Sequence, residues 1–600
     1  MENGRPGFFT TIKNIFAGIW FIIKETPLLA SFLITTLSFA FIFIFRLPLM
    51  DKEGFLTALY AGQFNGGYND VLPFSNPIFT YILRFFYNAK PETNWYLVLM
   101  EGILYFSYLI FGYVMLKFLR RGKRIFTVLF LVSVLLSAGC FLGAAPTAII
   151  SIGLAAVVLA ACAFYIKNTA QKIILSLVAF LTAAMGALAH SEASVYMIVT
   201  VILFFVLFTL TLSVKNKAPF SELLKKQLAV VCVLAVLAVG ISGALVFNGI
   251  FRSKYEVDTG DKSYFKAITA FKNSSQPKYS SDTPFYESIG FSENDYKIVV
   301  ESGNSALATE EQLVKLADYG RSNIGFAISS YFVRLGKYFV AIDSAAVFVF
   351  TLLLLLTFLI FDKKNKFMYL VMLVLFVLIH FVMCFIGGMS SLFISSYCQI
   401  LGLLALFVFG ADSAEKSEKT EAITIDKNRA AALALAVSLV VASCVSLYYT
   451  GYSVGRFIKS VSSEPLKASK NPIHLIRKQA SATKMMTEDF LYTNDEYSAE
   501  NKSIWKAPEK SLYNNTVFLD SRLSALPSSQ KTIEYTKSDD PMFSLINSRS
   551  SILFCNQSDI ELYVTYVKEH YKRTQVAYPV VAEFGDYAAY LIAASDETAD

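Results

Sequence analysis

The sequence predicts an α-helical protein that crosses a membrane many times and ends in a small α/β domain outside it. Three observations predict this fold class. The 600-residue chain is 55% hydrophobic and only 16% charged, whereas soluble proteins carry nearer a quarter charged residues. Apolar runs of about 20 residues recur along the chain, which is the length that spans a bilayer. Basic residues gather in alternate connections between these runs. The lipid bilayer is therefore the first partner that the sequence predicts.

We predict about eleven transmembrane helices. The expected spans are 28–48, 97–117, 125–143, 146–166, 172–190, 194–213, 228–248, 342–361, 367–387, 391–410 and 430–450. With a cytoplasmic N-terminus, the inner loops after spans two, six, eight and ten carry clusters of Lys and Arg, and the short outer connections after spans three, five and nine hold none. This pattern follows the positive-inside rule. An odd number of spans then places the C-terminus outside. The net charge of +7 comes mostly from these inner loops, so we expect no nucleic-acid partner.

The chain divides into three predicted parts. They are a cytoplasmic N-terminal segment with an interfacial helix (1–26), a transmembrane domain (27–450) with outer loops 49–96 and 249–341, and an extracytoplasmic α/β domain (451–600). In the first loop, 77–87 has the apolar spacing of a helix that lies flat on the membrane, with Asn76 as its cap and Pro77 in its first position. In the second loop, Thr309 and Gln312 match a capping box that opens a helix.

The tail has the pattern of a small α/β domain. We predict strands at 516–520 and 551–555, a helix at 560–572, and a hairpin over 580–592 that turns at Gly585-Asp586. Six of the seven cysteines fall within spans and Cys555 is alone in the tail, so no disulfide pattern is present. No Cys/His spacing typical of a metal site is found either.

The acids of the first outer loop are the main candidates for chemistry. Asp51 and Glu53 directly follow the first span, and Asn69 and Asp70 come later in the same loop. A carboxylate at a membrane exit can take a proton from an acceptor hydroxyl or hold a divalent cation. The alternative is that these acids only mark a solvated loop.

Other outer-face residues are candidates for substrate binding, each with a structural alternative. Arg84 and Arg334 suit a phosphate or snorkel to lipid headgroups. Trp95 suits a sugar ring or anchors the chain at the interface. His190 and Glu192, in the turn between spans five and six, can present ligands or form an ordinary surface turn. Glu101 lies just within the second span, where an acid is a functional candidate by default.

Three stretches resemble known proteins: Asn76-Pro77 through 94–96, 284–296, and 566–572 with the terminal hairpin. With the order of spans and outer loops, they resemble the GT-C class of membrane glycosyltransferases. The chain is more closely similar to polytopic membrane proteins of Gram-positive bacteria. The resemblance implies a multi-pass protein of the bacterial plasma membrane, with an extracytoplasmic C-terminus.

The same resemblance implies a reaction. It is an inverting transfer, on the outer face, of a sugar from a polyprenyl-phosphate-type donor to an envelope glycan acceptor. An acid of the first outer loop would be the base, and Asp51 best matches that position, with Asp70 as the alternative. No cofactor is implied with certainty, although Glu53 could hold a divalent cation. Two other functions stay open: a transporter or flippase of a lipid-linked glycan, and a non-catalytic scaffold for envelope assembly.

Overall fold

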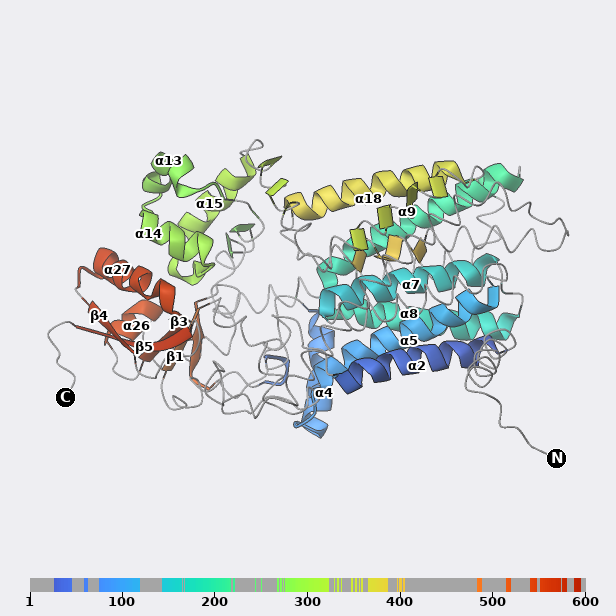
Figure 1. The fold of residues 1–600 in the computed structure, drawn as a ribbon, viewed down its shortest axis with the longest axis horizontal. Helices are drawn as coiled ribbons and strands as arrows, with labels where there is room; N and C mark the ends of the chain where they lie inside the picture. Colours follow the sequence, from blue (N-terminus) through green and yellow to red (C-terminus); the bar gives the residue numbers. More distant parts are fainter. Residues whose placement is uncertain are drawn as a thin grey trace, which may run out of the picture.

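A bundle of long helices fills one half of the molecule, and a sheet with its covering helices fills the other (Figure 1). The structure is a computed structural model. It describes residues 26–45, 59–62, 75–118, 143–164, 166, 168–216, 219–221, 243, 246, 250, 267–268, 270–271, 274, 276–322, 328–329, 332–333, 336, 347–348, 351–352, 355–356, 358–359, 365–386, 396–397, 399–401, 403–404, 483–487, 514–519, 540–547, 551–573, 575–579 and 587–594.

The bundle contains the predicted membrane helices that the structure describes. They are α2 (Pro27–Phe45), α5 (Trp95–Phe118), α7 (Ala144–Phe164), α8 (Thr169–Ala189), α9 (Ser191–Asn216) and α18 (Lys366–Ile386). Within the described residues, four of them (α5, α7, α8 and α9) are long and apolar enough to cross a membrane. They match the second, fourth, fifth and sixth predicted spans, while α2 and α18 lie at the first and ninth. The other predicted spans fall wholly or mostly outside the described residues, so the count of about eleven stays a prediction.

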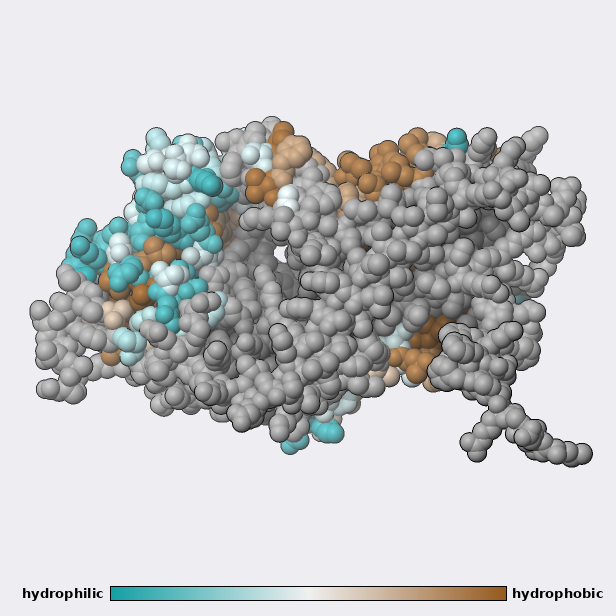
Figure 2. Space-filling view, in the orientation of Figure 1, coloured by the Kyte–Doolittle hydropathy of each residue, from teal (hydrophilic) through white to brown (hydrophobic). Residues whose placement is uncertain are grey.

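Helix α7 lies at the centre of this bundle. Its candidate span is 94% buried, and its sequence is rich in alanine, which lets neighbouring helices approach closely. Helix α8 approaches α7 closely at Gly186, where a Cβ atom would lie 2.0 Å from the Ser151 Oγ atom. The outer helices expose apolar side chains instead, such as Leu37 and Ile173. Figure 2 shows this hydrophobic surface over α18.

The two ends of the bundle carry different segments. At one end, Tyr96, Ala144 and Ala189 join a single buried cluster. At the opposite end, the Lys117 ammonium donates a hydrogen bond to Gln171 Oε1 at 2.9 Å. Residues predicted to be outside thus gather at one end, and the predicted inner residue Lys117 lies at the other. The orientation of the bundle in a membrane stays a prediction.

Helix α4 (Pro77–Ala89) crosses the first of these ends. The Asn76 side chain accepts a hydrogen bond from the Ile78 backbone N–H, and Pro77 occupies the first turn, so the predicted cap is confirmed. One face of α4, including Phe79 and Leu83, is fully buried. The opposite face exposes apolar side chains, with Phe85 70% exposed. This two-sided apolar character is consistent with the predicted location at a membrane surface.

The described part of the second outer loop, 276–322, is a compact group of short helices. It contains η2 (Tyr279–Ser281), α13 (Thr283–Ser288), α14 (Glu293–Asp295), η3 (Tyr296–Glu301), η4 (Ser305–Leu307) and α15 (Glu310–Ser322). The predicted capping box of α15 is confirmed, because the Thr309 N–H donates to Gln312 Oε1 and the Gln312 N–H donates to Thr309 Oγ1. Ser292 and Asp295 form a second capping box.

The described part of the tail is a five-stranded sheet with two helices on it. The strands are β1 (Thr483–Met486), β2 (Thr516–Phe518), β3 (Ser551–Asn556), β4 (Gln575–Pro579) and β5 (Tyr587–Ala594), in the order β2-β1-β3-β5-β4. Strand β1 pairs in parallel with β2 and β3, whereas β5 is antiparallel to β3 and β4. Short α26 (Pro541–Asn547), η9 (Gln557–Asp559) and α27 (Ile560–Tyr571) complete the described tail.

Both faces of the sheet are buried, each against a different part of the chain. Along β3, Ile552 and Phe554 belong to one hydrophobic cluster, and Leu553 and Cys555 to another. This alternation is the period of two that a strand imposes. We call the first cluster the docking core; it joins the sheet to Leu59, Tyr60, Phe79, Leu83, Tyr87, Tyr96, Met100, Ile103, Ala144 and Ala189. We call the second the distal core; it joins the sheet to α26, α27 and the 276–322 group.

Three tail predictions are confirmed and one is shifted. Strands β2 and β3 and helix α27 lie where the sequence predicts them. The hairpin exists, but its first strand is β4 at Gln575–Pro579, earlier in the chain than expected. The segment 580–586, with the predicted turn at Gly585-Asp586, lies outside the described residues. The predicted domain boundaries stay a prediction, although 276–322 and the tail share the distal core.

Strand β1 places a lysine between the sheet and the bundle. Lys484 pairs in register with Thr516 and Ile552, which puts it on the docking face, and it has no exposed surface. Its ammonium donates a hydrogen bond to the Asn514 carbonyl oxygen at 2.5 Å. Burial lowers the pKa of Lys484 to about 8, because the charged form loses its hydration.

We predict that the docking core holds the C-terminal α/β domain on the bundle. Phe79→Ala removes a fully buried ring that packs edge-on against Tyr60, and should cost about 3–5 kcal/mol of stability. The apparent unfolding midpoint of the detergent-solubilised chain should fall, and protease should release the tail more readily. Phe85→Ala, on the exposed face of the same helix, is the control. Equal effects of both changes would contradict the docking core.

The buried Lys484 predicts a pH dependence. Its folded pKa of about 8 lies below the ordinary 10.5, so between these values the unfolded chain binds more protons and stability rises with pH. Below pH 8 the cost of the buried charge is about 3 kcal/mol. Lys484→Met should therefore stabilise the chain more at pH 7.5 than at pH 10.5, as unfolding midpoints will show. Lys568→Met, at an exposed position, should show no such trend. A Lys484→Met effect that is constant over this pH range would refute the assignment.

Candidate functional site at the end of the helical bundle

The structure brings the first outer loop and the turn after α8 together. The Asn76 backbone N–H donates to the Leu188 carbonyl oxygen at 3.0 Å, two residues before His190. Helix α4 begins at this contact and leads to Arg84, which is partly exposed. Arg84, His190 and Trp95 therefore belong to elements at the same end of the bundle, as predicted for an outer face.

Trp95 has a structural role at the turn between α4 and α5. Its indole N–H donates to the Lys90 carbonyl oxygen at 3.0 Å, and its ring stacks on Phe86 with centroids 4.9 Å apart. The next residue, Tyr96, is buried and stacks on Tyr60. Sugar binding by Trp95 stays a prediction, and it would have to use the part of the half-buried ring that Phe86 leaves open.

His190 joins the end of α8 to the start of α9. Its backbone N–H donates to the Gly186 carbonyl oxygen, and its Nδ1 atom accepts a hydrogen bond from the Ala193 N–H at 3.2 Å. The Ser194 hydroxyl donates to the His190 carbonyl oxygen. His190 thus caps α9 while remaining partly exposed. The side chain of Glu192 lies outside the described part of the structure.

The other predicted site residues also lie outside the described residues. These are Asp51, Glu53, Asn69, Asp70 and Arg334. The roles of Asp51 or Asp70 as the base, of Glu53 as a ligand of a cation or of the acceptor, and of Arg334 as a ligand of the phosphate stay predictions. Asp51 and Glu53 come before the described segment Leu59–Gly62, which contributes to the docking core. Asn69 and Asp70 lie between that segment and Asn76, which contacts α8.

Glu101 is the most unusual group among the described residues at this end. It lies two turns into α5, is 4% exposed, and neither of its carboxylate oxygens has a hydrogen-bond partner in the described part of the chain. It lines a partly open cavity of about 400 Å³ between α2 and α5. The other lining residues are Thr36, Phe39, Ala40, Val98, Gly102 and Tyr105.

The chemistry of this cavity favours an amphiphilic ligand. Its walls are mostly apolar, and its two hydroxyl groups are paired with each other, since Thr36 Oγ1 and the Tyr105 hydroxyl lie 2.8 Å apart. The Glu101 carboxyl is left without a partner there, and such a group is costly to bury. A ligand with an apolar chain and a hydrogen-bond-donating head would satisfy both the walls and the carboxyl.

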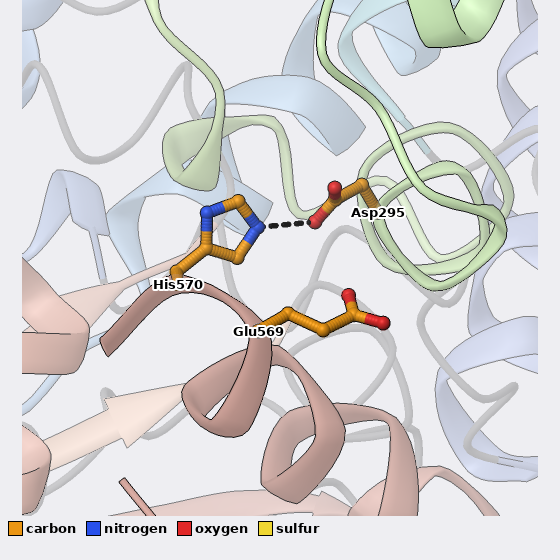
Figure 3. A group of neighbouring side chains, drawn as sticks. All are labelled: Asp295, Glu569 and His570. Atoms are coloured by element: carbon orange, nitrogen blue, oxygen red, sulfur yellow. Dashed lines mark hydrogen bonds and ion pairs between the residues drawn. The ribbon is translucent and has the colours of Figure 1, made fainter. Parts of the chain in front are cut away.

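A second polar cluster lies far from the bundle, where the 276–322 group meets the tail (Figure 3). The His570 Nε2 atom lies 2.7 Å from Asp295 Oδ1, and donor atoms of Asp295, Glu569 and His570 all lie within 4.8 Å of one another. The hydrogen bond with Asp295 raises the pKa of His570 above its ordinary value. Residue spacing does not reveal this cluster, because Asp295 and His570 are 275 positions apart. Two of the stretches that carry the resemblance, 284–296 and 566–572, nevertheless contain it.

Comparison with known proteins does not assign a family. No family model matches the chain, and no curated protein matches it. Among solved structures, the chain is similar to the apo form of an oligosaccharyltransferase from Archaeoglobus fulgidus. The TM-score is 0.42 and the identity 11%, over 90% of this chain and 71% of that chain. A TM-score of this size does not establish a shared fold, so the likeness assigns neither a fold nor an activity to this chain.

Proposed function

We propose that this protein is a membrane glycosyltransferase-like enzyme of the bacterial plasma membrane. It would transfer a sugar from a polyprenyl-phosphate-type donor to a cell-envelope glycan on the outer face. The observation that carries the proposal is the buried, unpartnered Glu101 carboxyl in an apolar cavity near the docking end of the bundle. A lipid-linked sugar combines an apolar chain with hydroxyl donors, and so matches both features of that cavity.

The location of Glu101 on α5 supports this proposal. Tyr96, Met100 and Ile103 form one face of the helix and belong to the docking core, whereas Val98, Glu101 and Tyr105 form another and line the cavity. Glu101 is five residues beyond Tyr96, about 8 Å along the helix axis. A lipid chain between α2 and α5 would therefore present its head at the end of the bundle where the first outer loop begins and ends.

The proposed reaction assigns roles to the acids and cations of the outer face. The acceptor oxygen would bond to the anomeric carbon of the sugar while the bond from that carbon to the phosphate oxygen breaks. Asp51, or Asp70, would take the hydroxyl proton, and the lipid phosphate would leave. Arg334 and Arg84 would hold this phosphate. Glu53 would orient the acceptor or hold a divalent cation. Asn69, Trp95, His190 and Glu192 would contact the sugar or the acceptor.

Substitution of two acids tests the proposal. In a strain that lacks the native gene, Asp51→Asn should lower sugar transfer about 100-fold or more, because it removes a general base. Glu101→Gln should lower transfer about tenfold, because the amide replaces one carboxyl oxygen with an NH₂ group that cannot accept a hydrogen bond, without lowering the unfolding midpoint of the protein. Mass spectrometry of the released envelope glycan provides the measurement. Glu92→Gln, in the exposed turn before α5, is the matched control.

Each alternative function predicts a different result. If the Asp51→Asn variant produces an unchanged glycan, Asp51 is not the base, and the proposed enzymatic function is refuted. A deletion strain that accumulates the lipid-linked sugar on the inner leaflet would indicate a transporter. Glycan loss in the deletion strain, with full rescue by both acid variants, would indicate a scaffold.

A further inference from the structure

The two exported parts of the chain meet at Asp295, Glu569 and His570. Glu569 and His570 extend from the end of α27, and Asp295 extends toward them from α14 (Figure 3). Asp295 is 4% exposed, while Glu569 and His570 are open to solvent on one side. A ring nitrogen and two carboxylate groups thus converge from two segments, and the opening on one side allows an ion to enter.

We propose that this cluster binds one divalent transition-metal ion, with Zn²⁺ or Mn²⁺ as the expected ion. The ligands are His570 Nε2, an oxygen of Asp295 and an oxygen of Glu569. An imidazole favours these ions over Ca²⁺ and Mg²⁺, which prefer oxygen ligands alone. Three protein ligands leave positions for water, as in open sites of zinc proteins. The site is independent of the proposed sugar transfer and lies in a different part of the molecule.

The positions of the three ligands are fixed before an ion binds. The Asp295 Oδ2 atom accepts the Ser292 backbone N–H at 2.9 Å, and the Ser292 hydroxyl donates to Glu569 Oε2 at 2.8 Å. The His570 ring packs against Tyr566, with centroids 4.2 Å apart. These contacts reduce the entropy that the side chains lose on binding. The separation of the donor atoms, at most 4.8 Å, is close to the spacing of ligands across one ion.

The surrounding charges also favour a cation. Besides burial, the charges of Glu287, Glu293, Asp295 and Glu569 all raise the pKa of Tyr279, and the charge of Asp540 adds to those of Asp295 and Glu569 in raising the pKa of His570. The neighbouring Lys297 is paired with Glu293 at 2.8 Å, so its charge is partly offset. The charged groups that act on His570, which are Asp295, Glu569 and Asp540, are all negative.

A metal ion here would fasten α27 to the 276–322 group. Existing hydrogen bonds already cross this contact: the Asn294 amide donates to the Leu562 carbonyl oxygen, and the Asn304 amide donates to the Tyr563 hydroxyl. The ion would add a link between positions 275 residues apart. An ion that binds the folded chain and not the unfolded one stabilises the folded state.

Metal titration of the full-length protein in detergent tests the site. After treatment with a chelator, calorimetry with ZnCl₂ and MnCl₂ should show one equivalent bound, and the unfolding midpoint should rise with metal. Glu569→Gln and His570→Gln should weaken binding at least tenfold and abolish the rise. Glu569→Gln is the more decisive change, because it leaves the Asp295–His570 hydrogen bond in place and so preserves the fold. Glu293→Gln is the control, because Glu293 lies two residues before Asp295, is paired with Lys297 and is not a ligand.

The outcomes separate a metal site from a hydrogen-bonded contact. Loss of binding in the ligand variants, with normal binding in Glu293→Gln, supports the site. The proposal is overturned if no metal binds, if all variants bind equally, or if only CaCl₂ and MgCl₂ raise the midpoint. In those cases the three side chains only hold α27 against the 276–322 group.

Discussion

The sheet of the C-terminal domain has two apolar faces, and the rest of the architecture follows from covering both. Its β2, β1 and β3 strands are parallel, and parallel strands are stable only where both faces are shielded from water. One face is covered by the end of the helical bundle and α4, and the other by α26, α27 and the 276–322 group. The sheet therefore fixes the relative position of the helical bundle, the 276–322 group and the tail.

This double burial explains why polar groups are found at unusual depth. Lys484 is enclosed because its strand position faces the docking core. Asn76 is enclosed because α4 begins against the end of α8. The Asn76 side chain caps α4, and its backbone N–H donates a hydrogen bond to the Leu188 carbonyl oxygen in α8. Helix α5 contributes one face to the docking core and another to the cavity that holds Glu101. The position of the sheet and that of the proposed ligand site are thus coupled through a single helix.

Local patterns in the sequence predicted the elements that have strong local signals. The cap at Asn76, the capping box at Thr309 and the apolar runs of α5, α7, α8 and α9 all depend on neighbours within a few residues. Strand β1 and helix α26 were missed, because the four residues of β1 include a lysine and α26 has only seven residues. Their structure depends on partners elsewhere in the chain. The shifted hairpin has the same cause, since β4 is defined by its pairing with β5.

The sequence by itself determined that this chain is apolar enough for a bilayer, where many helices begin, and which polar residues follow the predicted spans. The spacing of apolar residues and the distribution of charge are local properties of the sequence. They predict the membrane spans because unpaired backbone groups and charges are costly to place in lipid. Only the tertiary structure decided that Glu101 faces a cavity without a partner and that Asp295 meets His570 across 275 positions. Such contacts depend on how helices and strands pack against one another, and packing brings together residues whose spacing in the sequence carries no signal.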